Sequence, residues 1–438
     1  MRSALLMSLS LIGMVLPLDA SAQEWTLGWD WQVSMETVQS RDIPFNTAPE
    51  YDAQSINALL DLEVSTSGWL GLFAIKGNDL YSRYSGEKDL EPDADAEFIV
   101  RELFWQGGLE ISNALLGEQY LDLTLGKLRL DWGVGYGYRP LDIIKPYRQN
   151  PVGIVAEEGA GVASISIFDA TGEWTLLYSD SSWTSQEVNE LESRSEQQGI
   201  GLRRYNMMGE HEYQWLAYYD DVRHGLLGAS LVSVLNMAWE FHGSVSYQRQ
   251  SLGYQFPSST YSPVELQEQG DAYQALLGLT WANEVGHNVV LEYWFDSRAW
   301  SSSQWEQALD RATFLSEMPA TVNLASSYAQ GYQHANLVQH NLMFHWSLDS
   351  TAWAQIFNGS ALDSSSWLDN LTPTFDLMYS PADGGIIATQ WLNYQFIDTG
   401  TSSIDLELAA RFLTGKNDSA YANLPDSHMI LLNIKGRF

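Results

Sequence analysis

Hydrophobic and polar residues alternate along most of this 438-residue chain. Apolar side chains occupy every second position of 25–35, and the same alternation returns at 56–75, 239–248, 289–295 and 404–412. A period of two places one set of side chains on one face of a β-strand and the other set on the opposite face. We therefore expect strands with one dry face and one wet face.

A water-soluble β-sandwich also alternates, so three further features decide between the two architectures. The strands are about ten residues long, which matches a tilted membrane crossing. Short turns at 67–68, 170–172, 209–210 and 348–350 alternate with long polar loops. Aromatic residues gather at strand ends, where interfacial girdles lie: Trp25, Trp132, Trp174, Trp281, Trp346 and Trp353. The fold class predicted is all-β, a closed antiparallel up-and-down transmembrane β-barrel, because closure satisfies every backbone group in lipid.

About nineteen segments read as strands, but bacterial single-chain barrels have even strand numbers. One segment is miscounted, and the region 361–403 is the most ambiguous because two short connectors, 381–385 and 398–402, lie in it. We predict 18 strands, with 16 as the alternative. No domain boundary and no longer repeat is visible.

The first residues read as an export signal. Arg2 supplies a positive charge, 4–18 form an apolar stretch too short for a stable anchor, and Ala20-Ser21-Ala22 is a small-x-small cleavage site. We expect 1–22 to be a signal peptide and 23–438 to be the barrel. The alternative is an N-terminal membrane anchor; attachment through a lipidated cysteine is excluded because the chain has no cysteine.

The chain end carries the most specific local pattern. Ile430, Leu432 and Ile434 lead by twos, through Gly436, to the terminal Phe438. This resembles the recognition signal by which the outer-membrane assembly machinery of Gram-negative bacteria takes up barrel proteins. The resemblance implies that this machinery is a partner and that the protein is integral to the cell outer membrane, in contact with its lipid and lipopolysaccharide.

Composition removes several other classes of function. There are 55 acidic and 22 basic residues, a formal net charge of −33, so nucleic acid is not an expected partner. Without cysteine there are no disulfides, thiolate zinc sites, iron–sulfur clusters or cysteine nucleophiles. The 18 Trp and 22 Tyr residues are too many for a disordered acidic tail.

The most distinctive stretch runs from 125 to 146. Apolar residues are odd-numbered up to Leu125 and even-numbered from Leu128, so the phase slips near Gly126, which predicts a β-bulge that re-aims the strand. After the slip Lys127, Arg129 and Asp131 point to the lumen together. A glycine-rich segment follows and two prolines then stiffen the loop.

This stretch resembles the G-(K/R)-x-x-x-x-W-G…P-x-D pattern of porin-like outer-membrane barrels related to alginate exporters. The resemblance is close over about 30 residues and architectural elsewhere. It implies that charged residues of the strand and loop line the pore, and the matching positions here are Lys127, Arg129, Asp131, Arg139 and Asp142. A dedicated polyanion exporter would need a strongly basic lumen, which the acidic composition disfavours. The alternative is a charge cluster that only braces the wall.

Arginines recur at positions predicted to face the interior, against an acidic background. The arginines are Arg101, Arg203 or Arg204, Arg249 and Arg411, and the nearby acids are Glu102, Glu240, Glu292, Asp405 and Glu407. We expect most of them to pair with one another, although rings of charge could also tune selectivity.

Three predicted loop segments are also candidates for a functional role. In the long connection 297–335, apolar residues recur at helical spacing up to Pro319, and we favour a helix that constricts the pore over an external lid. For the acidic segments 87–97 and 187–196 we favour solvated loops that share divalent cations with lipopolysaccharide over a dedicated metal site. The first segment could hold a divalent cation, but it lacks the glycine that lets an EF-hand loop turn.

Catalysis receives little support. His242 with Glu240, and His340 with His345, are the nearest candidate pairs, and no nucleophile motif, zinc motif or P-loop occurs. We expect no enzyme, no cofactor and no metal. The predicted function is a porin-like channel for small or extended polar solutes; the alternative is a non-conducting barrel that acts in structure, adhesion or export with a partner.

Overall fold

Strands make up most of the chain in this computed structural model, which describes residues 25–46, 52–84, 94–113, 117–144, 153–184, 186, 189–334, 336–357 and 367–438. The predicted signal peptide therefore lies outside the described residues. The first strands are β1 (Thr26–Ser40), β2 (Ala53–Thr66), β3 (Trp69–Tyr84), β4 (Asp95–Asn113), β5 (Gly117–Leu128), β6 (Ala160–Asp169), β7 (Gly172–Asp180), β8 (Gln198–Met208), β9 (His211–Asp220) and β10 (Leu226–Asn236). The others are β11 (Trp239–Gln248), β12 (Ser251–Gln255), β13 (Glu265–Gln269), β14 (Ala272–Ala282), β15 (His287–Asp296), β16 (His340–Leu348), β17 (Leu371–Tyr379), β18 (Ile386–Asp398), β19 (Ser403–Thr414) and β20 (Asp426–Arg437).

Helices are short and lie in the connections. They are α1 (Glu190–Arg194), α2 (Ser302–Ser316), α3 (Val322–Ser327), α4 (Ala352–Ile356) and the 3₁₀ turns η1 (Tyr328–Gln333), η2 (Leu368–Asn370) and η3 (Tyr421–Asn423). None of the helices in the described ranges has the length and apolar character needed to cross a membrane.

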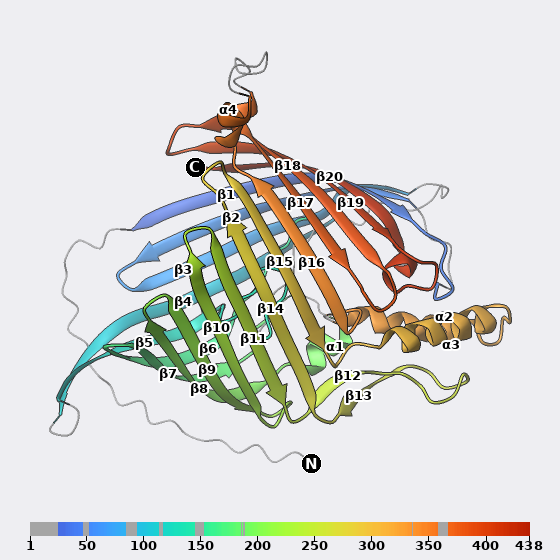
Figure 1. Ribbon diagram of the computed structural model, residues 1–438, viewed down its shortest axis with the longest axis horizontal. Coiled ribbons are helices and arrows are strands. Elements are labelled where there is room, and N and C mark those ends of the chain that lie inside the picture. Colours follow the sequence, from blue (N-terminus) through green and yellow to red (C-terminus); the bar gives the residue numbers. More distant parts are fainter. Residues whose placement is uncertain are drawn as a thin grey trace.

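Eighteen strands close into one antiparallel barrel, which confirms the predicted fold class and strand number (Figure 1). Each barrel strand pairs with the next one along the chain, and β1 pairs with β20, so the sheet has no free edge. The remaining two strands, β12 and β13, form a separate hairpin between β11 and β14. With this hairpin the described chain has 20 strands, of which 18 form the wall. The region 361–403, where the miscount was expected, contributes two wall strands, β17 and β18.

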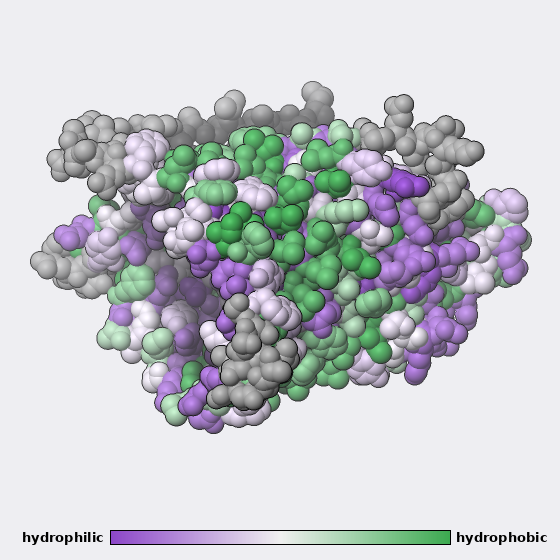
Figure 2. Space-filling view, turned by 90° about the horizontal axis from the view of Figure 1, so that it is seen from above, coloured by the Kyte–Doolittle hydropathy of each residue, from purple (hydrophilic) through white to green (hydrophobic). Residues whose placement is uncertain are grey.

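The alternation of the sequence becomes the two faces of the wall. On β9, Trp215 is 60% exposed on the outer face, whereas its neighbour Gln214 is 5% exposed on the inner face. On β11, Val245 faces outward between the buried Ser244 and Ser246. Figure 2 shows the resulting band of hydrophobic residues across the outside of the barrel. A wall that is apolar outside and polar inside suits lipid around a hydrated lumen.

The connections differ at the two ends of the barrel. At one end, here the turn end, most are tight, such as the two-residue turns 67–68, 170–171 and 209–210. At the other, the loop end, they include 129–159, 249–271 and 297–339. The turn predicted at 348–350 is wrong, because β16 ends at Leu348 and β17 begins only at Leu371, with α4 and η2 between them.

Candidate functional site

The segment 129–144, between β5 and β6, lies inside the barrel along its inner wall, and we call it the lumen segment. Its first part packs on the inner faces of β6–β10 and its tip contacts β14–β16 on another part of the wall. Glycine is required at the tip: a Cβ on Gly137 would overlap the sulfur of Met343 and approach Glu292. The glycine-rich composition thus allows the backbone to lie directly against the barrel wall.

Glu292 of β15 holds the tip. Its Oε1 accepts a hydrogen bond from the backbone N of Tyr136 at 2.6 Å, and its Oε2 accepts one from Gly137 N at 2.8 Å. On the other side, His242 Nε2 of β11 lies 2.8 Å from Glu292 Oε1. The carboxylate is buried, so each of these bonds is made away from bulk water and is strong.

Two aromatic rings of the tip complete its contacts. The ring of Tyr136 lies 4.4 Å from the ring of His345, whose Nδ1 is 2.6 Å from Asp376 Oδ1. Tyr138 stacks on Trp294 and donates its hydroxyl proton to Asp296 Oδ2 at 2.9 Å. Burial raises the pKa of Tyr138, and the neighbouring carboxylate adds to the effect, so this phenol remains a neutral donor.

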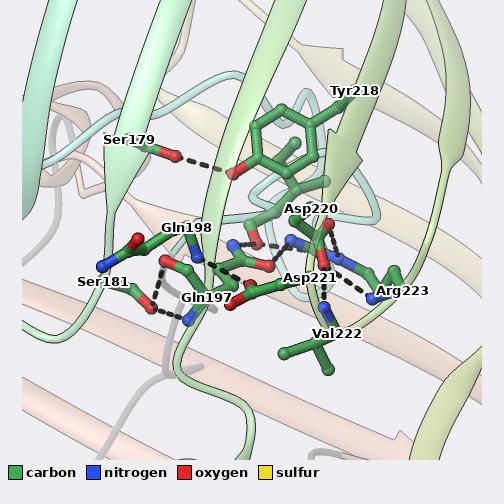
Figure 3. Close-up of polar contacts among 10 residues, drawn as sticks. Ser179, Ser181, Gln197, Gln198, Tyr218, Asp220, Asp221, Val222 and Arg223 are labelled. Carbon is green, nitrogen blue, oxygen red and sulfur yellow. Dashed lines mark hydrogen bonds and ion pairs between the residues drawn. The ribbon is translucent and has the colours of Figure 1, made fainter. Parts of the chain in front are cut away.

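The C-terminal end of the lumen segment, at Ile143, is held by a polar cluster at the loop end of β7–β10 (Figure 3). The carbonyl of Ile143 accepts hydrogen bonds from Gln197 Nε2 and Arg223 Nη1, each at 2.9 Å. Arg223 is in turn held by Asp220 Oδ2 at 2.8 Å, and Tyr218 shares a hydrogen bond with Ser179 at 2.7 Å. Because its tip and its C-terminal part are both held by the wall, the segment is an integral part of the barrel interior.

Apolar contacts support the same placement. Ile143 and Ile144 pack into a buried cluster on the inner wall with Val162, Leu177 and Leu216, and the partly buried Leu128, Leu130 and Trp132 pack against this cluster. This strip of the wall faces inward yet is apolar. The lumen segment covers it.

The five predicted pore-lining residues separate into two groups. Lys127 and Asp142 are buried. Lys127 Nζ pairs with Glu158 Oε1 at 2.5 Å, and Asp142 Oδ1 accepts hydrogen bonds from the backbone N of Trp132 at 3.0 Å and of Gly133 at 2.7 Å. Burial raises the pKa of Asp142, while these backbone donors oppose the shift.

The other three lie together on the open side of the segment. The Asp131 side chain is 55% exposed, with its Oδ1 3.3 Å from Arg129 Nε and 3.8 Å from Arg139 Nη1. Arg129 also pairs with Glu157. The sequence did not single out Glu157 and Glu158, which lie near the end of the long β5–β6 connection and have no alternation to mark them.

The predicted β-bulge at Gly126 is wrong. The register of β5 continues through Gly126 against both neighbouring strands, and the change of phase comes from its positive φ of 137°. The bulge lies instead in β4, where Val100 and Glu102 oppose consecutive residues of β3 and Arg101 is extra. Arg101 Nη1 bonds to Asp61 Oδ1 at 2.9 Å.

Most predicted interior arginines have polar partners, but the partners found are not the acids predicted beside them. Arg203 faces inward and bonds to Gln214 at 2.7 Å, Arg204 pairs with Asp169 at the turn end, and Arg411 bonds to Thr389 Oγ1 at 3.0 Å. Arg249 is the exception: it follows β11 and lines a hollow of the outer wall with residues that face outward. Arg249 continues the odd-numbered, outward-facing positions of Val245 and Tyr247, so the alternation of β11 places it outside and the predicted interior position is wrong. Among the predicted acids, Glu407 pairs with Lys435 at 3.0 Å.

The 297–335 connection contains the predicted helix but does not enter the barrel. Trp305, Ala308, Ala312 and Leu315 of α2 are buried in a core shared with the β1–β2, β11–β14 and β19–β20 connections. Figure 1 places α2 and α3 beyond the strand ends, at the same end as the β12–β13 hairpin. We call this loop-end core the cap. The constriction expected from 297–335 is therefore not formed by its helix, and it is the lumen segment that lies inside the barrel.

The candidate histidines are bonded mainly to residues other than the partners predicted for them. His242 is buried between Glu292, at 2.8 Å, and Glu240, at 3.9 Å, under the lumen segment. His340 contacts Tyr293 and Phe295, whereas His345 is bonded to Asp376, so the two are directed to different neighbours.

The acidic segments are described only in part. Residues 85–93 lie outside the described residues, as do 187 and 188; α1 covers 190–194. In the portion of the chain that is described, no group of three or more His, Asp or Glu residues is placed to hold a metal ion.

No protein family matches this chain, and no curated protein matches it. Solved structures do resemble its fold. OccAB1 of Acinetobacter baumannii has 9% sequence identity and a TM-score of 0.52, covering 94% of this chain and 96% of its own. OccK5 (OpdH) of Pseudomonas aeruginosa has 10% identity and a TM-score of 0.51, covering 95% and 98%. The neighbours are outer-membrane porins, which confirms the resemblance to porin-like barrels at the level of the fold.

Proposed function

We propose that this protein is an integral outer-membrane channel through which small polar solutes pass beside the lumen segment. The observation that carries the proposal is a segment held at its tip and at Ile143 inside the barrel, with a charge cluster in which Asp131 is half-exposed. The structurally similar porins are channels, and this supports transport over catalysis.

The orientation follows from the two ends. Barrels of this class have short periplasmic turns and long extracellular loops. The turn end therefore faces the periplasm, and the cap and the other long connections face outward. The apolar band on the outside of the wall provides the surface that lipid covers.

Within this channel we assign different roles to the predicted residues. Arg129, Asp131 and Arg139 line the path, because their cluster is the partly exposed one. Lys127 and Asp142 hold the segment in place, because each is buried and bonded to Glu158 or to the backbone. The path therefore carries both signs of charge, which favours polar solutes over a bulk polyanion.

Planar-bilayer recordings test the proposal. Wild-type protein should form discrete ion-conducting channels. Asp131→Asn removes an exposed negative charge, so the reversal potential in a salt gradient should shift toward anions, whereas Arg129→Gln should shift it toward cations. Arg437→Gln is the control, since Arg437 lies at the turn end in an exposed pair with Asp30.

A non-conducting barrel is the second candidate, and the cap is the observation that favours it. Loops from several connections share one buried core at the mouth. A barrel that remains ion-tight in bilayers, while a variant with an opened cap conducts, would support a closed protein with a structural or partner-binding role. Conduction by the wild type would support the channel.

A further inference from the structure

The outer wall carries a hollow of about 450 Å³ near the loop end of β7–β11. It arises because a row of large apolar residues across the strands is interrupted by one small residue. Ala217 of β9 pairs with Leu202 of β8 on one side and with Leu227 of β10 on the other, and all three line the hollow. Leu202 and Leu227 are exposed on this face, so the hollow opens toward lipid.

Tyrosines border the hollow on its loop-end side. Tyr219 is exposed beside it, and Tyr247 also lines it, with its ring 5.3 Å from that of Tyr273. Tyrosines in such a girdle lie at the level of the lipid head groups. The hollow thus begins where head groups end and acyl chains begin.

The guanidinium of Arg249 places a positive charge at the loop-end side of the hollow. Arg249 follows the last residue of β11, is exposed and lines the hollow together with His224, which comes from the tight β9–β10 turn. Asp271 accepts a hydrogen bond from the Tyr247 hydroxyl at 3.0 Å and partly offsets the charge. We therefore expect the apolar hollow to supply most of the affinity and Arg249 to select the head group.

We propose that this hollow binds one acyl chain of a lipopolysaccharide molecule of the outer leaflet, with a lipid phosphate on Arg249. An arginine guanidinium donates two parallel hydrogen bonds to a phosphate, and the loop end faces the leaflet in which this phosphorylated glycolipid resides. The site lies on the opposite side of the wall from the lumen, so it is independent of whether the barrel conducts.

Native mass spectrometry of detergent-solubilised protein, titrated with purified rough lipopolysaccharide, tests the hollow. Ala217→Phe fills it and should weaken the retained binding event by about tenfold or more. Ala217→Leu is a milder second variant, and a heat-modifiable band on a gel verifies that each variant is folded. Ala275→Phe is the matched control, because Ala275 faces outward between Val245 and Phe295, away from the hollow. Equal binding by the wild type and both folded Ala217 variants would overturn the proposal.

A second comparison tests the phosphate. Arg249→Gln should weaken lipopolysaccharide binding several-fold, whereas Lys416→Gln, which removes an exposed cation from another loop at the same end, should not. Phosphatidylglycerol serves as the competing anionic lipid. If it binds as tightly as lipopolysaccharide, or if Arg249→Gln has no effect, the assignment to lipopolysaccharide fails.

Discussion

At the scale of single residues, one carboxylate decides where the lumen segment lies. Glu292 receives two backbone N–H groups of the tip and one histidine nitrogen, at 2.6–2.8 Å. A carboxylate has two oxygens that can accept all three hydrogen bonds, whereas an amide has one accepting oxygen and one donating NH₂ group. Hydrogen bonds to a charged group stabilise by about 1.5–3 kcal/mol each.

Glu292→Gln should therefore release the tip without unfolding the barrel. The amide nitrogen would face a backbone N–H, so at least one bond is lost and the tip samples positions away from β15. Single-channel recordings should show larger current fluctuations than in the wild type. Glu240→Gln is the control, since Glu240 is 3.9 Å from His242 and makes no contact with the tip. Quiet recordings from Glu292→Gln would mean that the other contacts suffice to hold the segment.

At the scale of elements, the cap is a small folded unit in its own right. Trp305 of α2 lies 4.8 Å from the Trp300 ring and 5.0 Å from the Tyr332 ring, and its indole donates to the carbonyl of Leu337 at 2.6 Å. Ser301 caps the start of α2 in a capping box with Gln304. Most of its core comes from loop-end connections, with Met378 of β17 and Ile387 of β18 packed against it, so we expect the cap to lose its structure before the barrel does.

His334 makes the stability of the cap depend on pH. Burial, aided by Arg298, lowers the pKa of His334 to about 4, and its Nε2 accepts a hydrogen bond from Tyr254 N at 3.3 Å. Asp296 acts in the opposite direction. Since the unfolded cap protonates near pH 6.5 and the folded cap does not, stability present above pH 6.5 is lost as the pH falls toward 4, by about 3 kcal/mol.

Hydrogen exchange of peptides from α2, α3 and η1 measures this loss. After correction for intrinsic exchange rates, protection in the wild type should fall between pH 6.5 and 4, while β9 and β11 stay protected. His334→Gln keeps an acceptor but does not titrate, so its protection should vary much less. Identical pH profiles in the two proteins would assign the effect to another group.

The elements also mark what can be predicted from the sequence and what cannot. Alternation identifies wall strands such as β1 and β11 because each residue there has only two environments, lipid or lumen. In 129–144 apolar residues still alternate as far as Tyr138, but the segment has left the wall, so the alternation does not reveal its path. The partner of its tip, Glu292, lies on β15 and is about 155 residues away along the chain.

The candidate site was predicted in the same uneven way. The charges at Arg129, Asp131 and Arg139 were recognisable as a cluster because they are close in sequence. Their exposure, and the burial of Lys127 and Asp142, depend on Glu157, Glu158 and the backbone of Trp132, which are brought together only by folding. The sequence shows which residues are charged, but only the folded structure shows which of these charges are buried and which are exposed.

At the scale of the whole molecule, closure joins the two ends of the described chain. Phe438 N donates a hydrogen bond to Trp29 O at 3.1 Å, and the rings of these two residues stack with centroids 4.9 Å apart. Arg437 donates from Nε to Asp30 Oδ1 at 2.8 Å and from Nη2 to Asp30 Oδ2 at 3.0 Å. Ile430, Leu432 and Ile434 face lipid on the same strand. The strand that carries the predicted assembly signal also closes the barrel against β1. Phe438 thus has two roles to separate: its contact with Trp29 at this seam, and its predicted recognition by the assembly machinery.

Paired substitutions at the seam separate these roles. Trp29→Ala and Phe438→Ala each remove the stacked pair, so both should lower the stability of barrels refolded into vesicles by about 1 kcal/mol, read from urea titrations. Only Phe438→Ala alters the terminal aromatic that we expect the assembly machinery to recognise, so it alone should strongly reduce the amount of barrel in the outer membrane of cells. Phe168→Ala, at an exposed aromatic on β6, is the control for loss of lipid-facing area. If Trp29→Ala impairs assembly in cells as severely as Phe438→Ala, the terminal residue acts through seam stability, and recognition of the chain end is not needed to explain its effect.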